Sequence, residues 1–354
     1  MVTAIPSAVP NDAFSASPSH SPYEASTQHK HWRYSRTALD EQRASLNSAA
    51  VHVIRNAFEI DDPGSSNAIS FLSPADEYLL VKLYISKVGQ LCAHFHMPEV
   101  VEATACSYIR RFYLRNTVMD WHPKNVMLTA IFLASKTTNH PIPLEQYASH
   151  IPNTTPSDVL DLEFLVAQSL GFEFVVWHAH RALWGIYLDT QTLPDISFHT
   201  IHDAYIASVA HVRASRLSDA ELIYTPSQIA LACFHIAAPV LAEQWAKAKG
   251  ESDVISLLPA ISDMILQEGK PPDLERVREI DKRLKICKNP EKVVGTKAYL
   301  KKQAEEEAKA KEKREKKAAE IRALEDARDP FGGELDPEGA AKIERAKQLD
   351  EDDD

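Results

Sequence analysis

Apart from His29 and His31, which lie beside the N-terminal arm, two histidine pairs come closest, among the residues of this sequence, to the spacing of a metal site. His94 and His96 are separated by one residue, and so are His178 and His180. Imidazole binds zinc readily, but a zinc site needs three or four protein ligands, and no cysteine or carboxylate cluster stands at ligand spacing beside either pair. We therefore expect neither a metal site nor another cofactor.

The cysteines and glycines argue against catalysis. Cysteine occurs only at positions far apart, inside apolar or helical stretches, and no CxxC pair is present, which predicts buried free thiols in a reducing compartment. The 10 glycines do not form a phosphate-binding loop. We expect no catalytic residue and interpret the chain as an adaptor that binds another protein. An enzyme with a cryptic site is the alternative. The cysteines are Cys92, Cys106, Cys233 and Cys287.

Length and net charge further limit the classes of protein to which this chain can belong. The 354 residues, 44% of them hydrophobic, suffice for two domains with tails. A net charge of −11 disfavours a protein that binds nucleic acid directly. The start of the chain lacks a signal segment, and no apolar run approaches the ~18 residues of a membrane span, so we expect a soluble intracellular protein without a membrane partner. Lys87, Arg110, Arg111 and Arg115 give local basic character, interpreted as a solvated face, with an anion or phosphoprotein contact as the alternative.

The N-terminal part divides at a change of composition. Residues 1–28 are rich in Pro, Ser and Ala and are predicted to be a disordered arm. Residues 29–60 form the next segment, in which a loose capping box at Thr37 to Asp40 and apolar residues at seven-residue spacing predict a helix over about 37–58.

Residues 70–175 carry the start signals of five helices. Ser73 followed by Pro74 is an N-cap with proline at the first helical position. The third helix, from Val126 to Lys136, is apolar nearly all round, which is typical of the centre of a bundle. The other helices are expected over 101–112, around 143–150, and from Thr155 to Gly171.

An internal repeat extends this pattern over residues 176–270. Residues 122–134 match residues 225–237 position for position, and helices are expected at about 180–191, 199–220 and 252–267 around the second copy. No strand-like alternation competes, so the fold class is all-α. Lys136 is replaced by Pro239 in the second copy, which indicates that Lys136 serves a surface peculiar to the first unit.

The C-terminal part becomes progressively more charged. Residues 271–290 contain a helix expected from Leu274 to Cys287, and residues 291–354 are a charged extension that ends in an acidic tail. Residues 301–328 are almost wholly Lys, Glu, Ala and Arg. They are interpreted as a solvated single helix or a disordered segment, with a partner-docking element as the alternative.

Residues 112–136 resemble the cyclin box, and residues 224–231 resemble the matching part of a second box. His31 to Tyr34 and the helix after them are similar to the N-terminal extension of the cyclin that regulates the kinase activating other cyclin-dependent kinases. The resemblance covers about residues 30–290. It implies two tandem five-helix cyclin boxes with flanking N- and C-terminal helices.

The resemblance also implies a binding site and partners. Lys136 and Glu163 take the positions at which cyclins hold backbone groups at the start of the kinase's regulatory helix. The implied partners are a cyclin-dependent kinase and a RING-finger assembly factor, acting in the nucleus and within general transcription factor TFIIH on the tail of RNA polymerase II. Thr137 to Asn139 and Arg110 depart from the common cyclin pattern. Another transcriptional cyclin and a TFIIB-like promoter-binding adaptor are the alternatives.

Overall fold

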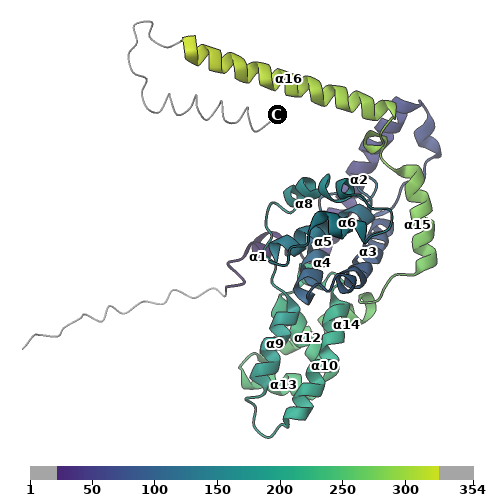
Figure 1. Cartoon of the computed structure of the whole chain (residues 1–354). Coiled ribbons are helices and arrows are strands. Elements are labelled where there is room, and N and C mark those ends of the chain that lie inside the picture. Colours follow the sequence, from purple (N-terminus) through teal and green to yellow (C-terminus); the bar gives the residue numbers. More distant parts are fainter. Residues whose placement is uncertain (1–21, 327–354) are drawn as a thin grey trace, which may run out of the picture. The chain divides into compact units, whose positions relative to one another are not determined.

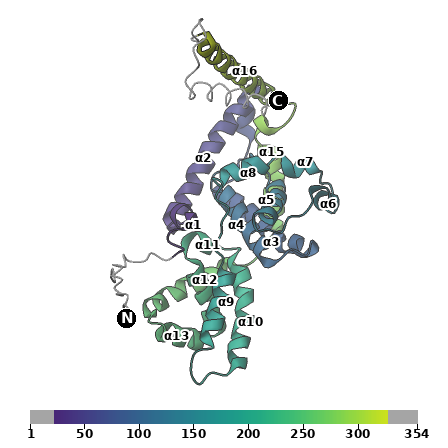
Figure 2. The same ribbon diagram turned by 60° about the vertical axis from the view of Figure 1, so that its left-hand side comes forward.

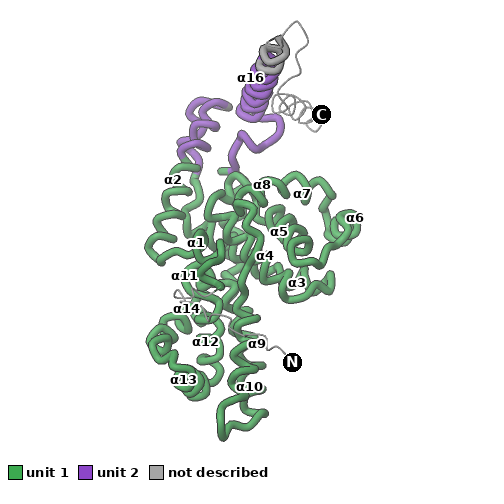
Figure 3. Tube along the Cα trace, turned by 90° about the vertical axis from the view of Figure 1, so that its left-hand side faces the viewer, with its two compact units in different colours: residues 1–51, 70–287 green, residues 52–69, 288–354 purple. Residues whose placement is uncertain are grey.

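A computed structural model describes residues 22–326 of the chain, and their regular elements are all helices (Figure 1). The all-α prediction is therefore confirmed. Contacts within the chain group its residues into two compact units, which Figure 3 shows in different colours. Unit 1 comprises residues 1–51 and 70–287, and unit 2 comprises residues 52–69 and 288–354.

The first bundle of unit 1 is built around one buried helix. That helix, α5 (Pro123–Thr137), is buried from Val126 to Ser135, as its apolar composition predicts. It packs against α3, α4, α7 and α8. Ser73 caps α3 in a capping box with Asp76. The surrounding helices are α3 (Pro74–His94), α4 (Glu99–Phe112), α6 (Leu144–Ser149), α7 (Pro156–Leu160) and α8 (Glu163–Ser169).

The last helix of this bundle differs from its prediction. One helix was expected from Thr155 to Gly171, but the structure has two, α7 and α8, with a turn between them. The Thr129 hydroxyl on α5 donates a 3.0 Å hydrogen bond to the carbonyl oxygen of Val159. This bond is made near the end of α7, and α8 begins at Glu163.

The second bundle repeats the first, and Figure 2 shows its helices around α12. α12 (Pro226–Ala237) is the counterpart of α5: it packs against α9, α10, α13 and α14, and Thr225 caps it in a capping box with Gln228. The predicted repeat is thus present in the structure. The other elements are α9 (Ala179–Thr190), α10 (Phe198–Ser215), α11 (Ala220–Ile223), α13 (Pro239–Ala248), η2 (Ser252–Leu257) and α14 (Leu258–Glu268).

Two boundaries in the second bundle were predicted wrongly. α10 ends at Ser215 instead of continuing to residue 220, because the chain turns there before α11. The predicted helix over 252–267 is a 3₁₀ turn, η2, followed by α14. α13 was not predicted at all. Its Pro239 lies at the first helical position, where a proline nitrogen needs no partner.

The N-terminal segment is more ordered than predicted. Residues 22–28, assigned to the disordered arm, form turns and the start of α1 (Thr27–His31), and Gln28 is buried. The remainder of that arm, residues 1–21, lies outside the described residues. α2 (Arg36–Asp61) begins one residue before Thr37, and the hydroxyl of Ser35, not of Thr37, accepts the 3.1 Å capping bond from the amide of Ala38.

The C-terminal elements belong to both units. α15 (Leu274–Cys287) has the predicted bounds and packs on α3, where Arg283 forms an ion pair with Asp76. In unit 2, α16 (Lys297–Asp326) follows η3 (Pro290–Lys292), and its described side chains are mostly exposed. η1 (Ser65–Ala68) also belongs to this unit. Of the two interpretations of residues 301–328, the helix is therefore correct through residue 326, and its side chains are mostly exposed through residue 319. The acidic tail lies beyond the described residues.

Candidate functional site

Lys136 and Glu163 lie side by side on the surface of the first bundle. Lys136 is in the last turn of α5, and Glu163 is the first residue of α8. The ammonium and the carboxylate form an ion pair, and 41% of the Lys136 side chain stays exposed. The Lys136 ammonium also lies 4.8 Å from the ring centroid of Phe132. Two residues chosen from a sequence resemblance are therefore brought together at one site.

The two charges are complemented by the helices that carry them. A cation is favoured at the C-terminus of a helix, where Lys136 lies, and an anion is favoured at the N-terminus, where Glu163 lies. Leu162 precedes α8 without a side-chain cap, so the first amides of that helix are available to the carboxylate. Each charge is thus complemented by the end of the helix that carries it.

Exposed apolar side chains follow Glu163 along the chain. The large apolar side chains of Phe164, Phe172 and Val175 are exposed, with Phe172 56% exposed. The ring centroids of Phe164 and Phe172 lie 6.2 Å apart. We call these three residues the apolar rim. None of the three was predicted from the sequence, although Phe172 and Val175, large apolar residues just after Gly171, were a signal for this surface.

Phe172 adopts a backbone conformation that phenylalanine rarely takes. Its φ is +58° and follows a φ of +64° at Gly171. A residue other than glycine in the left-handed region costs about 1–3 kcal/mol. The amide of Phe172 donates a 3.0 Å bond to the carbonyl of Ala167, which closes the end of α8. The structure thus retains a strained backbone that directs a large apolar side chain into solvent.

The N-terminal helix α1 fixes the segment that follows the rim. The Gln28 side chain accepts a 2.6 Å bond from the amide of Trp177 and donates a 3.3 Å bond to its carbonyl. The Trp32 indole N–H donates a 2.6 Å bond to the carboxylate of Glu173. On the other side, the hydroxyl of Tyr108 donates a 2.7 Å bond to the carbonyl of Phe174. The connection between the bundles is therefore held from both flanks.

Only two of the four basic residues predicted to form a solvated face are exposed. Lys87 and Arg115 are exposed, but Arg110 and Arg111 are buried. Arg110 lies 3.4 Å from the carboxylate of Asp219. The Arg111 guanidinium stacks 5.1 Å from the ring of Trp32. Their partners are far away in sequence, so the local pattern gave no sign of this burial.

The two histidine pairs differ in their surroundings, and the cysteines are buried. The Nε2 of His178 lies 3.0 Å from the hydroxyl of Thr104, and its ring stacks on that of His180, while His94 and His96 are exposed. Burial lowers the pKa of His180 to about 4. Between residues 22 and 326, no cluster of three His, Cys, Asp or Glu side chains is arranged for a metal ion. All four cysteines are buried and free, as predicted.

No helix in the described range is long and apolar enough to cross a bilayer.

Comparisons with known proteins agree with this architecture. The family model of the cyclin N-terminal domain matches residues 82–175, and that of the cyclin C-terminal domain matches residues 178–267. Cyclin mcs2 of Schizosaccharomyces pombe is 30% identical over 294 residues, which cover 81% of this chain and 91% of that protein. A putative cyclin-H of Dictyostelium discoideum is 31% identical over 60% of this chain and 75% of its own length.

Two solved complexes contain chains of similar fold. A chain in the CAK complex from Chaetomium thermophilum bound to ATP-gamma-S matches with a TM-score of 0.71 and 26% identity, over 89% of this chain and 97% of that one. A chain in the yeast TFIIK (Kin28/Ccl1/Tfb3) complex matches with a TM-score of 0.58 and 28% identity, over 69% of this chain and 100% of that one. With two tandem bundles matched by both cyclin domains, and relatives that cover most of its length, the chain belongs to the cyclin family and is similar to the cyclin-H proteins within it.

Proposed function

We propose that this chain is the regulatory subunit of a cyclin-dependent kinase, of the kind that activates other cyclin-dependent kinases. The observation that carries the proposal is the exposed Lys136–Glu163 ion pair beside the apolar rim. An ammonium and a carboxylate on neighbouring helices offer a donor and an acceptor to one backbone segment. The rim beside them offers apolar surface for a kinase to bury.

Binding at this site would act on catalysis through the kinase. Lys136 donates to a carbonyl, and Glu163 accepts from an amide, at the start of the kinase's regulatory helix. Held in this way, that helix places its own glutamate against the lysine that orients ATP. The chain contributes no group to the phosphoryl transfer itself, so its output is the activity of its partner.

The similar structures support a proposal for the wider assembly. Ccl1 is in one complex with Kin28 and Tfb3 in the yeast TFIIK structure. By this likeness, the chain binds a kinase and a third subunit, a RING-finger assembly factor. It acts in the nucleus, within TFIIH, and supports phosphorylation of the RNA polymerase II tail. The similarity to cyclin-H proteins favours this function over a promoter-binding adaptor.

Affinity capture from nuclear extract of the organism, followed by reconstitution, tests this function. We expect the tagged chain to retain a cyclin-dependent kinase together with a RING-finger protein. Mixed with the purified chain, the purified kinase should phosphorylate a polymerase-tail peptide much faster than it does alone. Recovery of a kinase without the RING-finger protein would indicate another transcriptional cyclin. Recovery of promoter factors without any kinase would refute the proposal.

The apolar rim should contribute to affinity but not to folding. We expect Phe172→Ala to weaken kinase binding about tenfold or more, because exposed aromatic residues at interface centres often contribute over 1 kcal/mol. The free energy of unfolding of this variant should change by less than about 0.5 kcal/mol, as for substitutions of other exposed residues. Isothermal titration and thermal unfolding measure the two effects.

Phe198 supplies the matched control for this experiment. It is 61% exposed on the second bundle, where its ring stacks on His202. Phe198→Ala should leave kinase affinity unchanged. Equal losses of affinity in both variants would show that the apolar rim has no special part in binding.

A further inference from the structure

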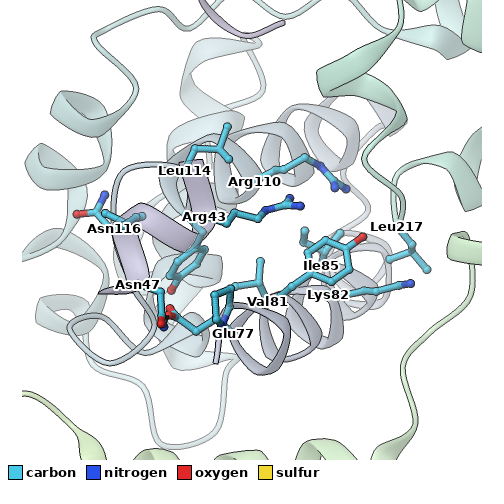
Figure 4. Close-up of a pocket in the computed structure, with 14 residues that line it drawn as sticks. Arg43, Asn47, Glu77, Val81, Lys82, Ile85, Arg110, Leu114, Asn116 and Leu217 are labelled. Carbon is cyan, nitrogen blue, oxygen red and sulfur yellow. Dashed lines mark hydrogen bonds between the residues drawn. The ribbon is translucent and has the colours of Figure 1, made fainter. Parts of the chain in front are cut away.

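A small cavity lies in unit 1 where α2 packs against α3 and α4. The centre of a water molecule can occupy about 40 Å³ of it. Its apolar lining comes from Val81, Ile85, Leu114 and Leu217. Figure 4 shows the side chains of Arg43, Lys82 and Arg110 around the same space. The cavity is therefore lined by both apolar and cationic side chains.

Two buried groups of this cavity have unused hydrogen-bonding capacity. Only 5% of Arg110 is exposed, and its Nε lacks a hydrogen-bond partner in the described part of the chain. The hydroxyl of Tyr78, which also lines the cavity, is buried without a partner there. A buried polar group without a partner is costly, and a buried charge is more so. Both groups are therefore suited to bind a hydrogen-bond acceptor.

Lys82 adds a cation that is incompletely compensated. It is 8% exposed, and its ammonium donates to the backbone carbonyl of Glu268, which carries no formal charge. Its nitrogen lies 5.9 Å from the ring centroid of Tyr78. Burial lowers the pKa of Lys82, as expected of an ammonium that has left water without an anion in contact.

The formal charges around the cavity leave an excess of one positive charge. Arg43, Lys82 and Arg110 are opposed by Glu77, which lines the cavity, and by Asp219, which forms ion pairs with Arg43 and Arg110. The Glu77 carboxylate is already occupied, since it accepts a 2.5 Å bond from the Asn47 amide and a 2.8 Å bond from the amide of Val118. The neighbouring Arg36 and Glu268 neutralise each other at 2.7 Å. Binding of one monoanion would bring the net formal charge of these groups to zero.

We propose that this cavity binds a short-chain aliphatic monocarboxylate, such as acetate or propionate. Its carboxylate would lie among Lys82, Tyr78 and Arg110, and its hydrocarbon part against Val81 and Ile85. At ~10–15 Å³ for each water centre, the cavity holds about three waters, which limits the ligand to a few heavy atoms. Phosphate is disfavoured because its four polar oxygens would face apolar side chains. This binding is independent of the kinase-binding function.

Titration of the full chain with propionate tests the site, with methyl NMR signals of Val81, Ile85 and Leu114 as the readout. We expect saturable shifts with propionate and at least tenfold weaker binding of propionamide, which has the same shape without the charge. Lys82→Met should weaken propionate binding at least tenfold. Lys87→Met is the matched control, because Lys87 is exposed on the same helix, and it should have no effect.

A second variant separates loss of the site from loss of the fold. Ile85→Phe keeps all the charges but fills the cavity, and it should abolish propionate binding while methyl signals of the second bundle stay in place. The proposal would be overturned by equal binding of propionate and propionamide, by unchanged binding in folded Lys82→Met, or by the absence of saturable shifts at 100 mM (roughly −1.4 kcal/mol of binding free energy). Phosphate binding as tightly as propionate would refute the carboxylate assignment.

Discussion

Replacing Lys136 by alanine should weaken kinase binding by roughly 2–5 kcal/mol, the cost of truncating one member of a hydrogen-bonded charged contact that an interface buries. This corresponds to about 30- to 4,000-fold in Kd. In the free chain the ammonium is in contact with Glu163 and the side chain is 41% exposed, so the mutation removes little packing. Its large effect arises only in the complex, where a kinase carbonyl would lose its donor. Titration calorimetry with the purified kinase measures the change.

The controls for this experiment separate the interface from the fold. Lys87→Ala removes a lysine that is exposed on α3, so its kinase affinity should equal that of the wild type. A double-mutant cycle with Glu163→Ala then measures how far the two residues act together. Unchanged affinity in a folded Lys136→Ala protein would remove this lysine from the kinase-binding site.

The helices were predictable where local chemistry determines where they begin. Ser73 with Pro74 and Thr225 with Pro226 are start signals in which a side chain satisfies amides that the first turn leaves free, and both helices begin as expected. The break between α7 and α8 was not predictable in this way. It coincides with a hydrogen bond from Thr129, a residue of another helix, and a local pattern contains no information about such a contact.

The site was predictable only in part, for a similar reason. Lys136 and Glu163 were assigned through the resemblance to cyclins, and the structure places them in contact. Arg110 was assigned to a solvated face because Asp219, its partner, lies 109 residues further along the chain. The apolar rim went unnoticed because exposure of Phe172 depends on the left-handed turn after α8, which periodicity does not reveal.

Loss of the Asp219 carboxylate should destabilise the chain more than any surface substitution, because Asp219 joins α2 to both bundles. It accepts two bonds from Arg43, at 2.7 and 2.8 Å, and lies 3.6 Å from Arg36 and 3.4 Å from Arg110. Removing one partner from a buried ion pair typically costs 3–5 kcal/mol, since the remaining charge stays buried. We therefore expect Asp219→Ala to reduce the free energy of unfolding by about 3–5 kcal/mol, measured by urea denaturation.

The pKa of the same carboxylate predicts how the stability of the fold changes with pH. Burial alone would raise the pKa of Asp219, but the bonds and charges of Arg43, with Arg110 and Arg36, together hold it below its ordinary value of 3.8. A carboxylate with a lowered pKa stabilises the fold above the pKa of the unfolded chain, and its contribution is lost as the pH falls through the folded pKa. The stability difference between wild type and Asp219→Ala should thus be complete at pH 7 and shrink below about pH 4.

Asp203→Ala is the control. It removes an exposed partner of His199 and should change the free energy of unfolding by less than about 0.5 kcal/mol. A difference between wild type and Asp219→Ala that persists unchanged at pH 2 would mean that the loss comes from packing and not from the charge.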